Sequence, residues 1–230
     1  MTLYEQLLRD TVDDRDYLLR APAIQRCLSG DVTRELYVAF LTQAYHHVRH
    51  TVPLLMAVGA RLPDRHAWLR DSVLHYLNEE TGHEQWILND IEQAGGDRAA
   101  AEGSRPAIAT EAMVAYAYDM VMRRNPVGFF GMVHVLEGTS VSLALLAADR
   151  IQEALHLPLQ AFSYLRSHGE LDKEHVNDLA AILSRLHDPG DRAAVIQCAR
   201  GIFWLYGNVF RSLDAGASQA VYLESPRKTA

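Results

Sequence analysis

The segment His168-Gly-Glu-Leu-Asp172-Lys-Glu-His175 is the most informative part of this chain. In an α-helix, residues i, i+4 and i+7 lie on one narrow face, so His168, Asp172 and His175 would project the same way. Leu165 and Leu179 lie near that side, so the three residues border an apolar stripe. Two imidazoles and a carboxylate form a ligand set that suits a transition metal such as iron. The segment therefore predicts a helix that faces a metal site.

Two further elements can complete this site. Glu80-Thr-Gly-His83 has helical i, i+3 spacing, and Glu137 lies in the apolar run that begins at Met132. A carboxylate in such a run is costly unless it is paired, and di-iron helical bundles use inward-facing Glu and Glu-x-x-His pairs. Three carboxylates would balance most of the charge of two ferrous ions. We interpret six residues as one iron site: Glu80, His83, Glu137, His168, Asp172 and His175.

The whole chain has helical periodicity without strand-like alternation. Breaks are expected at Pro22, Pro63, Gly95, Pro126 and Pro189, and residues 97–107 are expected to form a loop. Seven helical segments follow: about 3–20, 33–61, 64–94, 108–124, 127–156, 158–187 and 190–214. The prediction is an all-α, seven-helix bundle over residues 1–215, with a C-terminal tail at 216–230.

Composition narrows the functional classes. The chain has 230 residues, 49% of them hydrophobic, and a formal charge of −7, which argues against a nucleic-acid-binding surface. No window approaches 18 uninterrupted apolar residues, so no membrane span is expected. The N-terminus lacks the apolar region of a signal peptide, which predicts a cytoplasmic protein. Cys27 and Cys198 lack metal-ligand spacing and are expected to be reduced core thiols.

Other histidines and several aromatic residues compete for roles near the site. His47, His50 and His134 are candidates for orienting the metal ligands, and the alternative is an ordinary surface or structural role. Five apolar residues are candidates for an aliphatic pocket, and the alternative is that they only pack in the core. These are Phe129, Phe130, Met132, Val141 and Phe203.

The pattern formed by Glu80-x-x-His83, Glu137 and His168-x-x-x-Asp172-x-x-His175 resembles the heme-oxygenase-like di-iron oxidases. This resemblance covers residues 5–215 in helix order and length, and its fold is shared with TenA/PqqC-like proteins. It implies that the six residues are iron ligands and that the site holds Fe(II), as two ions of which one is weakly held. Relatives include a fatty-acid decarboxylase, N-oxygenases and a p-aminobenzoate synthase.

Departures from these relatives narrow the expectation. The aminobenzoate type carries a tyrosine and a lysine where this chain has Leu136 and Ala147, and some N-oxygenases place a glutamate near His47. TenA thiaminases use a cysteine that is absent from the corresponding region. The decarboxylase type is therefore the nearer analogue.

The resemblance implies a non-heme iron enzyme that uses O2 as co-substrate. It would act on a small organic acid or amine by oxidative decarboxylation, desaturation or oxygenation. The alternatives are a metal-free TenA-like ligand-binding or regulatory protein, a cofactorless PqqC-like oxidase, and a protein that holds one heme through a histidine. The apolar last helix favours a homodimer, and no nucleic-acid or membrane partner is expected.

Overall fold

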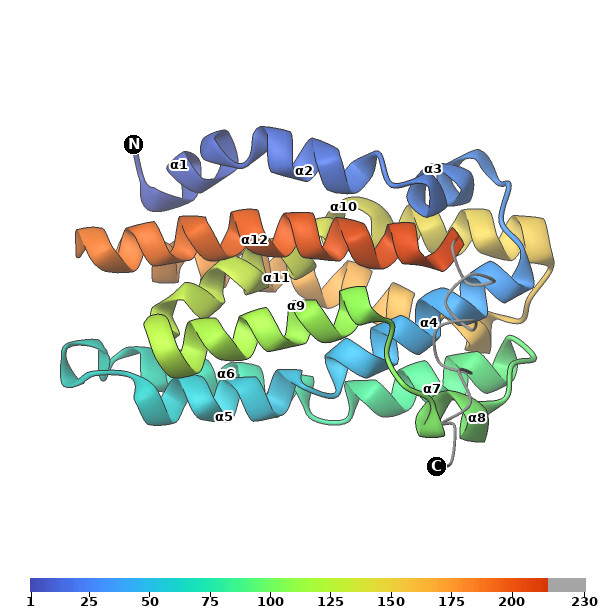
Figure 1. Cartoon of the computed structure of the whole chain (residues 1–230), viewed down its shortest axis with the longest axis horizontal. Helices are drawn as coiled ribbons and strands as arrows, with labels where there is room; N and C mark the ends of the chain where they lie inside the picture. Colours follow the sequence, from blue (N-terminus) through green and yellow to red (C-terminus); the bar gives the residue numbers. More distant parts are fainter. Residues whose placement is uncertain (215–230) are drawn as a thin grey trace, which may run out of the picture.

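The N-terminal helices lie along one side of an elongated bundle, as Figure 1 shows. The computed structural model describes residues 1–214, apart from the side chains of 168–175 and 214. The first three helices are α1 (Leu3–Asp10), α2 (Val12–Leu19) and α3 (Pro22–Ser29). The predicted helix over 3–20 is divided at Thr11, whose φ and ψ of −115° and 14° leave the helical region. All three helices pack against the last helix of the chain.

The next two segments also form paired helices rather than single long ones. The segment predicted at 33–61 consists of α4 (Arg34–Val48) and α5 (Thr51–Arg61), and the Thr33 side chain caps α4. After a 3-10 turn, η1 (Asp64–His66), the segment predicted at 64–94 consists of α6 (Leu69–Glu80) and α7 (His83–Gln93). Within the predicted loop, Asp97 caps a short helix, α8 (Arg98–Gly103), so the expectation of a loop without helix was wrong.

The C-terminal half supplies the longest helices. Helix α9 (Ile108–Asp119) continues into a π-turn, η2 (Met120–Arg124), before the predicted break at Asn125-Pro126. The turn η3 (Pro126–Gly128) leads into α10 (Phe129–Leu155), and η4 (Leu159–Phe162) leads into α11 (Ser163–Ser184). Helix α12 (Pro189–Asp214) follows. The described residues contain helices and no β-strand, which confirms the all-α prediction.

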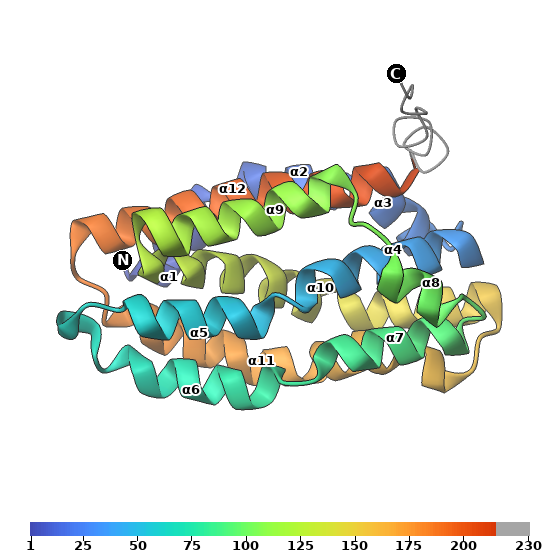
Figure 2. The ribbon, with the colours of Figure 1, turned by 60° about the horizontal axis from the view of Figure 1, so that its bottom comes forward.

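Helix α10 lies at the centre of the bundle. It packs against α11 and α12, and Figure 2 shows it between a layer containing α9 and α12 and another containing α6 and α11. By length and composition, the segment Pro126–Leu155 is the one described helix that could cross a membrane, with a mean hydropathy of 1.5. Half of the most apolar 18-residue stretch of this segment is buried inside the bundle. The central position of α10 therefore accounts for its apolar composition.

A polar cluster at one end of the bundle fastens the start of α12. Asp191 has no exposed surface and accepts hydrogen bonds from His66 Nε2 at 2.5 Å and Asn125 Nδ2 at 2.8 Å. Arg65 adds an ion pair at 3.1 Å. Burial alone would raise the pKa of Asp191, but the hydrogen bonds from Asn125 and His66 hold that pKa below its usual range. The buried charge is therefore fully paired, as its burial requires.

Candidate metal centre and apolar pocket

Glu80 and His83 meet at a break between two helices. Helix α6 ends at Glu80 and α7 begins at His83, so the expectation of one continuous helix through both was wrong. Gly82 has a φ of 95°, a left-handed conformation that glycine adopts without steric cost. Thr81 is extended, and its hydroxyl donates to the Leu77 carbonyl at 2.6 Å. The corner nevertheless brings His83 Nδ1 to 3.2 Å from Glu80 Oε2.

The three described candidate ligands are buried. Glu80 and Glu137 are each 8% exposed, and His83 is 2% exposed. The Trp86 ring stacks on the His83 imidazole with 4.1 Å between centroids, which fixes the orientation of that imidazole. Buried carboxylates and an imidazole are donor types that suit iron, and a cation there would offset the cost of burying two carboxylates.

Tyr76 lies in the electrostatic field of both glutamates. Burial raises the pKa of its phenol far above the usual range, and the negative charges of Glu137, Asp178, Glu79 and Glu80 raise it further. Glu137 is the largest of these charge effects. Because Tyr76, Glu80 and Glu137 also line one pocket, two of the six predicted ligands share a single buried environment.

The other three predicted ligands, His168, Asp172 and His175, have side chains outside the described residues. The backbone of α11 is helical throughout that segment, as the sequence predicted, and α11 packs against both α10 and α7. Within the residues whose side chains are described, no group of three or more His, Cys, Asp or Glu residues could hold a metal ion by itself. A complete six-residue site therefore stays a prediction, with α6, α7 and α10 supplying its described part.

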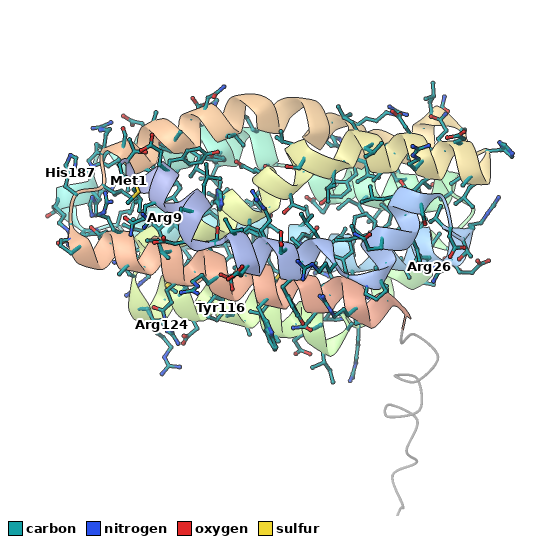
Figure 3. The ribbon with its side chains drawn as sticks, turned by 90° about the horizontal axis from the view of Figure 1, so that it is seen from above. Met1, Arg9, Arg26, Tyr116, Arg124 and His187 are labelled. Carbon is teal, nitrogen blue, oxygen red and sulfur yellow. The ribbon has the colours of Figure 1, made fainter. Side chains whose placement is uncertain are left out.

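A pocket of about 160 Å³ has both glutamates in its wall. Its lining residues follow α10 from Phe129 to Ile151, a helical rise of about 33 Å. The lining also includes Cys27 on α3. Its neighbour Arg26 is labelled in Figure 3 at the end of the bundle opposite His187. Most of the lining is apolar, and among its described members only Glu80 and Glu137 are acidic. Its other polar side chains include His47, Thr51, Tyr76, Thr139 and Ser140.

Only some of the expected pocket residues contribute to this lining. Phe129 and Met132 line the pocket as predicted. Phe130 and Phe203 are buried in the main hydrophobic core without lining the pocket, and Val141 is also outside the lining. Ser140 also lines the pocket, one helical turn after Glu137, and its i, i+3 spacing from Glu137 is the sequence signal that could have predicted this.

The three candidate orienting histidines have different surroundings. His47 is 3% exposed, lines the pocket and packs edge-on against Tyr206, with 5.7 Å between ring centroids. His50 is outside the pocket lining, and its Nδ1 lies 3.2 Å from the Tyr118 hydroxyl.

His134 lies on α10 outside the pocket lining, and its ring centroid is 6.0 Å from the ring centroids of both Tyr4 and Phe203. Burial, helped by the charge of Arg15, lowers the pKa of His134 to about 4. It is therefore a neutral core residue at physiological pH. Of the three candidates, His47 is the one that reaches the pocket.

Comparisons with solved structures show the fold. The chain is similar to a domain of unknown function with a heme-oxygenase-like fold from Shewanella denitrificans, with 23% identity, a TM-score of 0.83 and coverage of 100% of this chain and 98% of that one. It is also similar to a TenA homologue from Pseudomonas syringae pv. tomato, with 12% identity, a TM-score of 0.75 and coverage of 91% and 92%.

A third similar structure is heme oxygenase-1 from the cyanobacterium Synechocystis in complex with heme. It has 14% identity, a TM-score of 0.74 and coverage of 97% of each chain. At these identities the similarity establishes the fold and not the activity. No curated protein matches the sequence.

The family model described as iron-containing redox enzyme matches residues 38–207, which include every predicted iron ligand. With buried carboxylates and an imidazole gathered beside an apolar pocket, in a heme-oxygenase-like fold, the chain belongs to the iron-containing redox enzyme family.

Proposed function

We propose that this protein is a non-heme iron enzyme that uses dioxygen to oxidise an organic acid or amine with an apolar body. The main support is the placement of Glu80 and Glu137, both buried, in a pocket whose remaining lining is mostly apolar. Two carboxylates in such a pocket repel each other and lose hydration, so an occupant with positive charge is favoured there. Membership of the iron-containing redox enzyme family supports iron as the proposed occupant.

The predicted ligand set would hold Fe(II) through Glu80, His83 and Glu137, together with His168, Asp172 and His175 on α11. When bound, iron supplies electron transfer to dioxygen, which is the oxidant of the proposed reaction. The chain would hold two ions, one of them weakly. The substrate's polar group would lie near the two glutamates, and its apolar part would run along α10 from Glu137 toward Ile151. Decarboxylation, desaturation and oxygenation remain the three candidate reactions.

The protein residues also protect and orient this site. The stacked Trp86 ring fixes the His83 imidazole, and His47 brings an imidazole to the pocket wall. The apolar lining excludes water from the substrate, which strengthens electrostatic interactions inside the pocket. We further propose that the protein is cytoplasmic and forms a homodimer, with no nucleic-acid or membrane partner.

Anaerobic titration of the metal-free protein with ferrous iron tests this proposal. The wild type is expected to bind up to two irons per chain, and E137Q and H83A are expected to weaken the first binding step by roughly tenfold or more. H66Q is the matched control for a buried histidine, because His66 pairs with Asp191 and does not line the pocket. Admission of oxygen with a long-chain carboxylic acid or amine should then consume O2.

The competing functions predict different results in the same experiment. A metal-free ligand-binding protein, which the mostly apolar pocket would also suit, predicts no iron binding and tight binding of an apolar molecule. A heme protein that uses His47 predicts a Soret band after addition of hemin, which H47A would remove. Equal iron binding by wild type, E137Q and H83A would contradict the proposed site.

A further inference from the structure

Asp90 is a fully buried carboxylate that belongs to neither the predicted iron ligands nor the pocket lining. It lies on α7 and reaches the first turn of α11, more than seventy residues later in the chain. One carboxylate oxygen accepts hydrogen bonds from the Ser163 backbone N–H at 3.0 Å and from the Ser163 hydroxyl. The other accepts from the Tyr164 backbone N–H at 2.8 Å.

These bonds replace a cap that α11 lacks locally. The residue before α11 is Phe162, which has no side chain able to accept a hydrogen bond from the first turn. The first N–H groups of a helix have no partner within it, and the helix dipole favours a negative charge at that end. Asp90 supplies both the acceptors and the charge from another helix. The position of α11 along its own helix axis is therefore tied to the position of Asp90.

The same contact joins two parts of the predicted centre. Asp90 follows His83 by seven residues, about two turns, so both lie toward one side of α7. On the other partner, Tyr164 and Leu165 line the pocket at the start of the helix that continues through 168–175. Tyr37 supports this junction, since its hydroxyl donates to the Ala161 carbonyl at 2.6 Å.

We propose that Asp90 is a positioning residue, which sets the place of α11 relative to α7 and thereby the geometry of the pocket wall and of the iron site. This inference rests on the proposed function for its effect on iron, but its effect on the pocket wall is independent of iron. Both carboxylate oxygens of Asp90 accept hydrogen bonds from the start of α11, so the number of acceptor atoms at position 90 can be tested. An amide at position 90 keeps the shape of the side chain but replaces one acceptor with an N–H donor. One backbone N–H of α11 then faces a donor instead of an acceptor.

The test compares D90N with D191N. Asp191 is the matched control because it is equally buried and also hydrogen-bonded, but it fastens the other end of the bundle. Both variants should lose stability in urea denaturation. Only D90N should weaken ferrous binding, by on the order of tenfold, and only D90N should weaken binding of the apolar dye Nile red. S163A, which removes one of the three bonds, should give a smaller change in the same direction.

The outcomes separate this inference from the proposed function. If the wild type binds no iron, the proposed function fails, and the Nile red affinities of D90N and D191N still decide the role of Asp90. If D90N and D191N lose similar stability and both retain wild-type affinity for the dye and for iron, Asp90 is only structural and the inference is overturned. If D90N does not fold, S163A decides: wild-type affinity for both ligands would overturn the inference.

Discussion

Replacement of His134 by leucine should remove a specific part of the protein's sensitivity to acid. His134 is 7% exposed, and its ring packs between Tyr4 and Phe203. Burial, with a contribution from Arg15, lowers the pKa of this imidazole from 6.5 to about 4. Leucine has a similar volume and suits these apolar neighbours, so the variant should fold.

The sign follows from proton binding in the two states. Between pH 6.5 and 4 the unfolded chain protonates His134 while the folded chain does not. The free energy of unfolding therefore falls as the pH decreases through this window. A shift of about 2.5 units corresponds to a loss of about 3 kcal/mol, because one unit is worth about 1.4 kcal/mol. Below pH 4 both states bind the proton, so His134 causes no further fall in the free energy of unfolding.

Urea denaturation of the metal-free protein at pH 7 and pH 4.5 measures this loss. Carboxylates such as Asp191 also titrate toward acid, so the quantity of interest is the difference between the two proteins. H134L should lose about 2 to 3 kcal/mol less than the wild type between these pH values. A leucine at the other buried histidine, in H66L, would not serve as a control, because it would also remove the hydrogen bond to Asp191. Equal losses by wild type and H134L would refute the assignment of a neutral buried imidazole.

The remaining predictions concern packing and thiol reactivity. G131A should destabilise the protein by roughly 2 kcal/mol or more in urea denaturation, because an added Cβ would lie 2.2 Å from the Val195 carbonyl oxygen of α12. G138A, on the same helix, is the control. It should be neutral or stabilising by about 1 kcal/mol, since nothing lies within 4 Å of an added Cβ there. Similar destabilisation by both changes would contradict the close packing of α10 against α12. Burial raises the pKa of Cys27 to about 11 and that of Cys198 to about 12, so at pH 8 Ellman's reagent should modify the native thiols on the order of a hundredfold more slowly than the unfolded ones. Rapid modification of Cys27 in the native protein would show that its thiol is more accessible than the structure indicates.

The sequence was sufficient to predict the fold class and the ends of the main helical segments. Pro22, Asn125-Pro126 and Asp188-Pro189 act locally, through the fixed φ of proline and its restriction of the preceding residue. Burial of Glu137 was also predictable, because it stands inside a long apolar run. The corner at Thr81-Gly82 was missed because an isolated glycine is compatible with a helix, and the choice between helix and turn depends on how α6 and α7 pack.

The sequence by itself determined the kind of molecule: an all-helical bundle with acidic and imidazole side chains at helical spacing beside apolar stripes. Only the tertiary structure decided which of these groups share an environment. Periodicity gives the face of a residue on its own helix but not the neighbour of that face. For this reason the sequence could not distinguish the pocket-lining His47 from His134 in the core. It also gave no sign that Asp90 caps a helix that begins at Ser163, because that contact joins residues distant in the chain and follows from packing alone.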